Sequence, residues 1–298
     1  GIGNIVVGRY AGADIIDADG NVAIGAFDGT VQPAMRLNTK SHDNVAIGAG
    51  ALATHNLTDN SSGSNVAVGY AAGTAVTTGV KNTLLGARTG TALTAGSENT
   101  VVGRDALFTD TLGSKSVAIG QDALASQNFT TATDSYNTAV GHSAGLAITT
   151  GDQNTLIGAA AGDALTVGNN NVAVGYEALS GDTKGDRNVA IGRAALQSQN
   201  FTTSTDSYNI GIGYGAGETI TTGTQNTLIG GLAGDALTVG SFNIAIGKET
   251  LSTDTKGSKS VGVGNGTLFA QNFTSATDAY NVAVGHQAGV AVTTGVQN

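Results

Sequence analysis

One short pattern of apolar and polar positions recurs along the whole chain. Its core is Asn-Val-Ala-Ile-Gly or a close variant, in which an apolar, a small and a second apolar residue follow a polar one. Copies most often begin 17 positions apart, and from Asn44 onward the intervals run 21, 17, 17, 17 and then repeat. A fixed period indicates stacked repeats, so we interpret each interval as one coil. The copies begin at positions 4, 21, 44, 65, 82, 99, 116, 137, 154, 171, 188, 209, 226, 243, 260 and 281.

Each coil is predicted to hold two short strands joined by turns. In the first strand side chains alternate, so Val66 and Val68 share one face while Ala67 lies on the other. A second strand, over residues 74–77, carries one large apolar residue, and glycine follows each strand where the chain must turn. Because so short a unit cannot bury an apolar face alone, the coils must stack. The pattern therefore predicts an all-β parallel solenoid, a rod of about 75–80 Å at about 4.8 Å per coil.

Four successive coils form a larger repeat, here called a cassette. Residues 116–187 and 188–259 align without gaps and match at 48 of 72 positions. We expect irregular coils over residues 1–43 and regular coils over residues 44–298, and we interpret the chain as an excerpt of a longer one. The predicted cassettes are 44–115, 116–187, 188–259 and an incomplete 260–298.

The polar residue that opens each copy has a structural explanation. In stacked parallel coils, one Asn per coil forms a ladder whose side-chain amides hydrogen-bond from coil to coil. Ser116 and Ser260, which replace Asn in two coils, can keep part of this bonding. The predicted ladder comprises Asn21, Asn44, Asn65, Asn82, Asn99, Asn137, Asn154, Asn171, Asn188, Asn209, Asn226, Asn243 and Asn281.

The small residues at the strand centres suggest contact with other chains. Ala67, Ala118 and Gly211 occupy this position in three different coils. Solvent-facing strand positions usually carry larger side chains, whereas small ones let another backbone approach closely. We therefore predict that this small face packs against other copies, most simply three around one axis.

The repeated motif also resembles a known family. Asn-Val-Ala-Ile-Gly-x-x-Ala, at residues 44–51 and 188–195, resembles the head repeat of YadA-type trimeric autotransporter adhesins. Asn-Thr-Leu-Ile-Gly-x-x-Ala-Gly, at residues 154–162 and 226–234, is similar to the repeat arrays of phage-type tail fibres. The resemblance implies a left-handed parallel β-roll in a homotrimer, displayed outside the cell or on a virion. The coils of this chain are longer than those of YadA-type heads.

Each cassette has a four-residue insertion in one coil, and such insertions project as loops along one side of a solenoid. The loops cover residues 127–131, 199–203 and 271–275, with a first counterpart at residues 55–58. Three interpretations stay open: a turn with Phe over the core edge, an N-glycosylation site, or a periodic contact site. Each loop contains an Asn-x-Ser/Thr pattern, at Asn56, Asn128, Asn200 and Asn272.

A tyrosine follows each of the last three loops. These tyrosines are expected to pack on the loop or to form a binding ladder, and they are Tyr136, Tyr208 and Tyr280.

Composition excludes several classes of protein. The chain has 46 Gly among 298 residues but only one Pro, whereas collagen needs many prolines and Gly at every third residue. The absence of Cys removes disulfides and thiolate metal sites. No apolar run reaches about 18 residues, so we expect no membrane insertion. A net charge of −9 without Lys/Arg clusters argues against nucleic acid as a partner.

Little in the sequence suggests chemistry. The four histidines are scattered, no Ser/His/Asp set has the spacing of a triad, and residues 17–20 lack the remaining ligands of a calcium loop. We therefore expect no metal, no cofactor and no enzymatic activity. A third function class, an ice-binding solenoid, needs Thr at matched positions in every coil, and the pair Thr77-Thr78 recurs only once per cassette.

The expected function is a non-enzymatic structural and adhesive fibre, the repeat module of an extracellular trimeric surface adhesin or appendage. The alternative is the shaft of a phage tail fibre or spike whose receptor-binding tip lies outside this stretch. The expected partners are two further copies, end-to-end neighbours in a filament, and a ligand on a host cell, a neighbouring cell or the matrix. Multivalent weak binding would suit identical loops at a fixed spacing.

Overall fold

A computed structural model describes residues 1–27 and 29–298. Residue 28 lies outside the described residues. It belongs to the second interval of the repeat, the long one between Asn21 and Asn44. The chain forms two compact units, residues 1–150 and 151–298, and each is a stack of coils with one three-residue strand per coil. The described residues form strands, turns and bends only, and none of them belongs to a helix that could cross a membrane.

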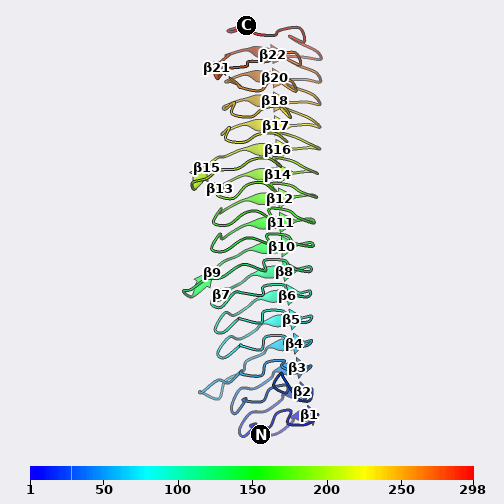
Figure 1. Cartoon of the computed structure of the whole chain (residues 1–298), viewed down its shortest axis with the longest axis vertical. Coiled ribbons are helices and arrows are strands. Elements are labelled where there is room, and N and C mark those ends of the chain that lie inside the picture. Colours follow the sequence, from blue (N-terminus) through cyan, green and yellow to red (C-terminus); the bar gives the residue numbers. More distant parts are fainter. Residues whose placement is uncertain (28) are drawn as a thin grey trace. The chain divides into compact units, whose positions relative to one another are not determined.

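In each unit eight strands lie side by side in chain order and run parallel (Figure 1). The first unit contains β1 (Ile5–Val7), β2 (Val22–Ile24), β3 (Val45–Ile47), β4 (Val66–Val68), β5 (Thr83–Leu85), β6 (Thr100–Val102), β8 (Val117–Ile119) and β10 (Thr138–Val140). The second unit contains β11 (Thr155–Ile157), β12 (Val172–Val174), β14 (Val189–Ile191), β16 (Ile210–Ile212), β17 (Thr227–Ile229), β18 (Ile244–Ile246), β20 (Val261–Val263) and β22 (Val282–Val284).

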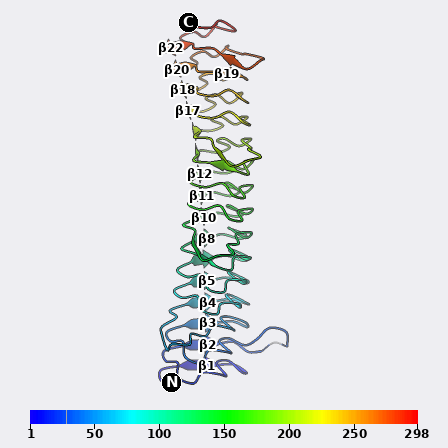
Figure 2. The ribbon, with the colours of Figure 1, turned by 90° about the vertical axis from the view of Figure 1, so that its left-hand side faces the viewer.

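Within each unit, short parallel pairs accompany the long-loop coils and project away from the stacked three-residue strands (Figures 1 and 2). The first unit has β7 (Gly113–Ser114) with β9 (Thr133–Asp134). The second unit has β13 (Gly185–Asp186) with β15 (Thr205–Asp206), and β19 (Gly257–Ser258) with β21 (Thr277–Asp278).

The register places equivalent residues of successive coils opposite one another. Between β12 and β14, Val172 lies opposite Val189 and Ala173 opposite Ala190. The same register holds between strands that are separated by a coil with an inserted loop. The predicted parallel β-solenoid is therefore confirmed, and each side-chain position of the coil forms a row along its unit.

The second strand predicted for each coil is wrong. Residues 74–77 form turns and bends, because Ala71 and Gly73 adopt left-handed backbone conformations with φ of 56° and 59°. The segment still bonds to the next coil: the Thr77 amide donates to the Thr94 carbonyl at 2.9 Å. Backbone hydrogen bonds therefore hold this side of the stack without an extended strand.

The predicted orientation of the strands is also wrong. Ala67, at the centre of β4, is fully buried, while Val66 on the same strand is 39% exposed. The same holds in the second unit, where Ala190 is buried and Ile191 is 36% exposed. The small residues line the interior because the coil is narrow and larger side chains from its opposite side fill the space. The small face is therefore not available to other copies, and the β-branched residues lie on the outside of each stack.

Two kinds of coil fill this narrow interior. In one kind a buried Leu, such as Leu179 or Leu196, lies eight residues after the opening Asn and faces an Ala at the strand centre. In the other kind Gly takes that place and the strand centre is often Leu, as with Gly162 and Leu156. A Cβ at Gly162 would lie 2.8 Å from Leu156 Cδ2, closer than packed atoms approach. In this coil the Leu at the strand centre therefore takes the space that the later Leu takes in the other kind.

Replacing the glycine that ends each strand should destabilise the stack. Gly158 has a φ of +135°, and a Cβ there would overlap the backbone carbonyl of Gly175 in the next coil. We expect Gly158→Ala to lower the free energy of unfolding by at least about 1–3 kcal/mol, because both the conformation and the space exclude a side chain. Urea unfolding followed by circular dichroism measures this change.

The matched control is Gly231→Ala. A Cβ at Gly231 meets only the Tyr214 carbonyl oxygen, at 4.0 Å. We expect this variant to unfold within about 0.5 kcal/mol of the parent protein. Equal stability of the two variants would contradict the packing described for Gly158.

Candidate functional site

One surface feature that repeats in every coil is the outward-facing side of the stacked strands, hereafter the outward face. It consists of the first and third residue of each three-residue strand, two positions per coil. The third position is always Val, Ile or Leu, and the first is Val, Ile or Thr. Such a charge-free apolar surface is unusual on a monomeric protein, where large apolar patches mark interaction sites.

Inside each unit the asparagines predicted to form a ladder are all buried. Asn171 Oδ1 accepts a hydrogen bond from the Asn188 backbone amide at 2.9 Å and from Asn188 Nδ2 at 3.1 Å. Asn171 Nδ2 donates to the Gly185 carbonyl at 2.9 Å. The Asn171 amide thus links two successive coils and also closes a turn of its own coil. Where Ser116 replaces Asn, its backbone amide still donates to Asn99 Oδ1 at 2.9 Å.

A buried polar pair lies beneath each regular inserted loop, and it was missed in the sequence. Asp110 Oδ2 accepts a hydrogen bond from Gln127 Nε2 at 2.6 Å, and Asp110 Oδ1 accepts from the amides of Gly113 and Phe129, both at 3.1 Å. Gln127 Oε1 in turn accepts from Asn137 Nδ2 at 2.9 Å. The Asp–Gln pair therefore links the inserted loop to the asparagine ladder by hydrogen bonds. The signal was present, since the pair recurs once per cassette, as Asp182 with Gln199 and as Asp254 with Gln271.

Different side chains occupy the same place beneath the first inserted loop. Asn38 and His55 replace Asp and Gln, and His55 Nε2 lies 2.8 Å from Ser41 Oγ and 3.3 Å from Asn65 Nδ2. The imidazole is fully buried, and this desolvation lowers the pKa of His55 to about 4. His55 is therefore a neutral packing element at physiological pH.

In the loops, the aromatic side chain covers the edge of the core. Phe129, Phe201 and Phe273 are buried, as the turn interpretation expects. The preceding Asn continues an exposed row of threonines that was also missed in the sequence: Thr183 Oγ1 donates to Asn200 Oδ1 at 2.9 Å. The predicted acceptors Asn56, Asn128, Asn200 and Asn272 all belong to this row. Glycosylation of these residues stays a prediction.

The tyrosines that follow the loops lie about half exposed in small charged clusters. Lys115 Nζ lies 2.5 Å from Asp134 Oδ2 and 5.3 Å from the centre of the Tyr136 ring. Lys259, Asp278 and Tyr280 repeat this arrangement, and Arg187, Asp206 and Tyr208 form a similar one. Each cluster pairs its own charges at the surface, which contributes little to stability.

The described residues contain no group of three His, Asp or Glu side chains arranged to hold a metal ion. His142, which the sequence places in phase with Tyr70 and Tyr214, is exposed and bonds to its neighbour Ser143 at 3.0 Å. His42 instead lies in the N-terminal coils, where Nδ1 accepts a hydrogen bond from the Asp19 amide at 2.9 Å. These histidines therefore occupy unrelated settings and do not converge on one site.

Comparison of the chain with protein-family models, with curated proteins and with solved structures found no match. The interpretation of the outward face and of the loops therefore depends on the geometry of the chain itself.

Acidification should destabilise the first unit through His55. The folded protein holds the pKa of His55 at about 4, below its ordinary 6.5, so the unfolded chain binds more protons between these values. Stability should therefore fall as the pH drops from about 6.5 to about 4, by about 3 kcal/mol in total. Replacing this residue by His55→Gln, the side chain that Gln127 supplies in the next cassette, should remove that contribution.

Urea unfolding at pH 7 and pH 4.5 measures the effect. The control is His142→Gln, which makes the same substitution at an exposed imidazole outside the core. An identical pH dependence in His55→Gln and the parent protein would contradict the role given to this side chain.

Proposed function

We propose that the chain is the repeat module of a non-enzymatic, extracellular structural and adhesive fibre, and that three copies associate through the outward face. The observation that carries the proposal is the row of half-buried to exposed Val, Ile and Leu side chains that runs along the strands of both units. The partners that cover the outward face in this proposal are a second and a third copy of the same chain. The number three rests on the resemblance of the motif to the head repeats of trimeric adhesins.

The periodicity of the outward face favours a copy of the chain over an unrelated partner. Because the strands are stacked in register, each coil presents at least one apolar side chain at the same spacing as in any parallel copy. Two copies placed side by side therefore match coil for coil along each unit. The β-branched side chains Val189 and Ile191 lose little rotamer freedom when they become buried. Association would also remove apolar surface from water at roughly 25 cal/mol per Å².

A structural role is supported by where the polar groups lie. The buried Asp and Gln side chains beneath the loops are occupied in holding those loops, and the buried asparagines bond to the neighbouring coils. These groups serve the stacking of the coils, so they are not directed at a substrate. The repeated loops and tyrosine clusters then form the surface that remains accessible when the outward face is covered.

A charge on the outward face should dissociate the oligomer. Ile246 in β18 is 37% exposed in the single chain, and we expect it to be buried between copies. In Ile246→Glu an unpaired carboxylate would be buried, which costs about 3–5 kcal/mol and weakens association at least about 100-fold. Sedimentation equilibrium should give three times the chain mass of 29.3 kDa for the parent protein and lower masses for the variant.

The control variant is Val239→Glu. Val239 is similarly exposed, at 39%, but it lies outside the strands, so the trimer should persist. Circular dichroism shows whether both variants keep the β-solenoid. A parent protein that sediments as a folded monomer at micromolar concentration would refute the proposal.

A further inference from the structure

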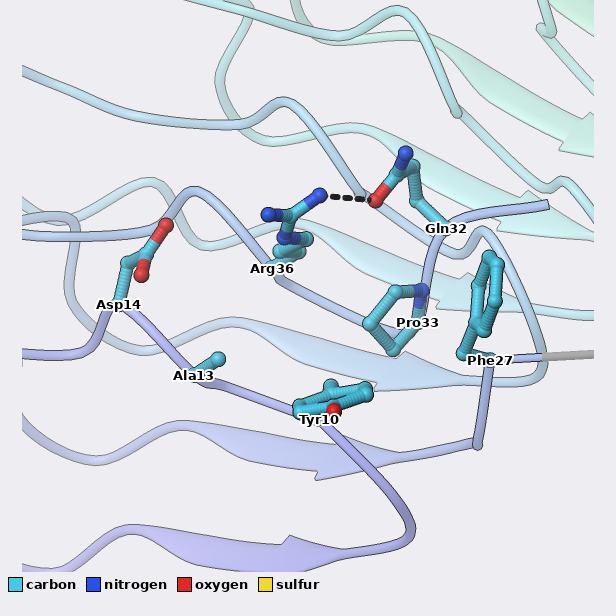
Figure 3. A pocket seen from close by; sticks show the side chains of 7 residues that line it. All are labelled: Tyr10, Ala13, Asp14, Phe27, Gln32, Pro33 and Arg36. Atoms are coloured by element: carbon cyan, nitrogen blue, oxygen red, sulfur yellow. Dashed lines mark hydrogen bonds between the residues drawn. The ribbon is translucent and has the colours of Figure 1, made fainter. Parts of the chain in front are cut away.

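The first unit contains a cleft of about 250 Å³ between its first two coils. One wall comes from the first coil, with Tyr10 and Asp14, and the other from the long second interval, with Phe27, Gln32, Pro33 and Arg36. Figure 3 shows Pro33 next to Phe27 and above Tyr10, with Arg36 and Gln32 higher up and Asp14 to one side. The regular cassettes have no counterpart of this wall, because their coils lack the six-residue extension.

Backbone hydrogen bonds hold both walls in place. The Gly12 amide donates to the Ala34 carbonyl at 3.0 Å, and the Asp14 amide donates to the Arg36 carbonyl at 3.2 Å. The Gly50 amide, from the third coil, donates to the Gln32 carbonyl at 2.6 Å. The cleft is therefore built into the coil stack before any ligand arrives, which reduces the entropy lost on binding.

The side chains in the cleft are also positioned by contacts of their own. Arg36 Nη1 donates to Gln32 Oε1 at 2.6 Å. The guanidinium of Arg9 lies 4.9 Å from the centre of the Tyr10 ring and so supports it from outside the cleft lining. The two aromatic rings are nevertheless exposed, Tyr10 by 56% and Phe27 by 37%. Both keep apolar surface available to a ligand.

The chemistry of the lining selects a class of ligand. The lining itself carries one cation, Arg36, and one anion, Asp14, while the nearby cation Arg9 is engaged with the Tyr10 ring, so the lining offers a ligand no net charge. The aromatic and proline surfaces suit an apolar patch of C–H groups, while carboxylate, guanidinium and amide groups suit hydroxyls that both donate and accept. A pyranose sugar presents these two features on its different sides. The volume accommodates one ring and excludes an enclosed disaccharide.

We infer that this cleft binds a single uncharged pyranose, as the terminal sugar of a surface glycan. The ring stacks its C–H face on Tyr10 and Phe27, and its hydroxyls bond to Asp14, Gln32 and Arg36. This inference deepens the adhesive part of the function proposed above by naming the ligand class. It does not depend on the trimer, because every residue of the cleft belongs to one chain.

Saturation-transfer difference NMR on the full chain tests the inference. The probes are the methyl pyranosides of glucose, galactose, mannose, fucose, N-acetylglucosamine and N-acetylgalactosamine. At least one probe should receive saturation at its ring C–H protons, and Tyr10→Ala and Phe27→Ala should each weaken its binding at least tenfold. Asp14→Asn should change the ranking of the probes, since it alters only the hydroxyl contacts. No saturation transfer to any of the six probes would overturn the inference.

Controls separate binding in the cleft from other effects. Tyr136→Ala removes an exposed tyrosine far along the same unit and should leave sugar binding unchanged. Circular dichroism verifies the fold of each variant. Binding that survives both Tyr10→Ala and Phe27→Ala, or selective binding of adenosine or benzoate as comparison probes, would also overturn it. Because Ile246→Glu tests the trimer and these variants test the cleft, failure of one proposal leaves the other standing.

Discussion

The architecture depends on the buried amide that joins each coil to the next. A side-chain carbonyl such as Asn171 Oδ1 accepts two hydrogen bonds from the following coil, while its amide group closes a turn of its own. A buried amide with unmatched partners would cost about 1–3 kcal/mol per group, so a shift of register by one residue is penalised in every coil. The ladder therefore fixes the register, and the register turns each position of the repeat into a row.

The distribution of residues between the inside and the outside follows from the width of the coil. A narrow interior accepts Ala at the strand centre together with one Leu from the opposite side, as Ala190 and Leu196 show. Val and Ile are then left on the outer face, although they are the more apolar residues. The coil thus completes its own core and still carries an apolar surface. This combination favours stable stacks of coils that also associate laterally.

Much of the fold could be predicted from the sequence, because the period of the repeat and the Asn that opens each copy both indicate stacked coils. Alternation along a strand shows which residues share a face, but it does not show which face lies inside. Placing the small face of β4 against other copies was wrong, since Ala67 lies inside, together with larger side chains such as Leu52 that come from a different part of the coil. The prediction of a second strand was wrong because no residue type reveals the left-handed backbone conformation that residues such as Ala71 adopt. The cleft was beyond prediction, as Tyr10 and Arg36 meet only through the stacking of two coils.

The outward face and the cleft differ in how often they occur in the chain, and this difference connects their proposed roles. The face repeats in every coil, whereas the cleft occurs once in the described chain and binds one small ring. One pyranose in an open cleft gives an affinity near the millimolar range, about −4 kcal/mol, which is too weak to hold a cell surface. Three chains joined through the outward face would present three clefts at a fixed separation. Simultaneous binding then raises avidity by factors of about 10²–10⁴ without any new contact. Assembly through the repeated surface is therefore what would make the single cleft useful for adhesion.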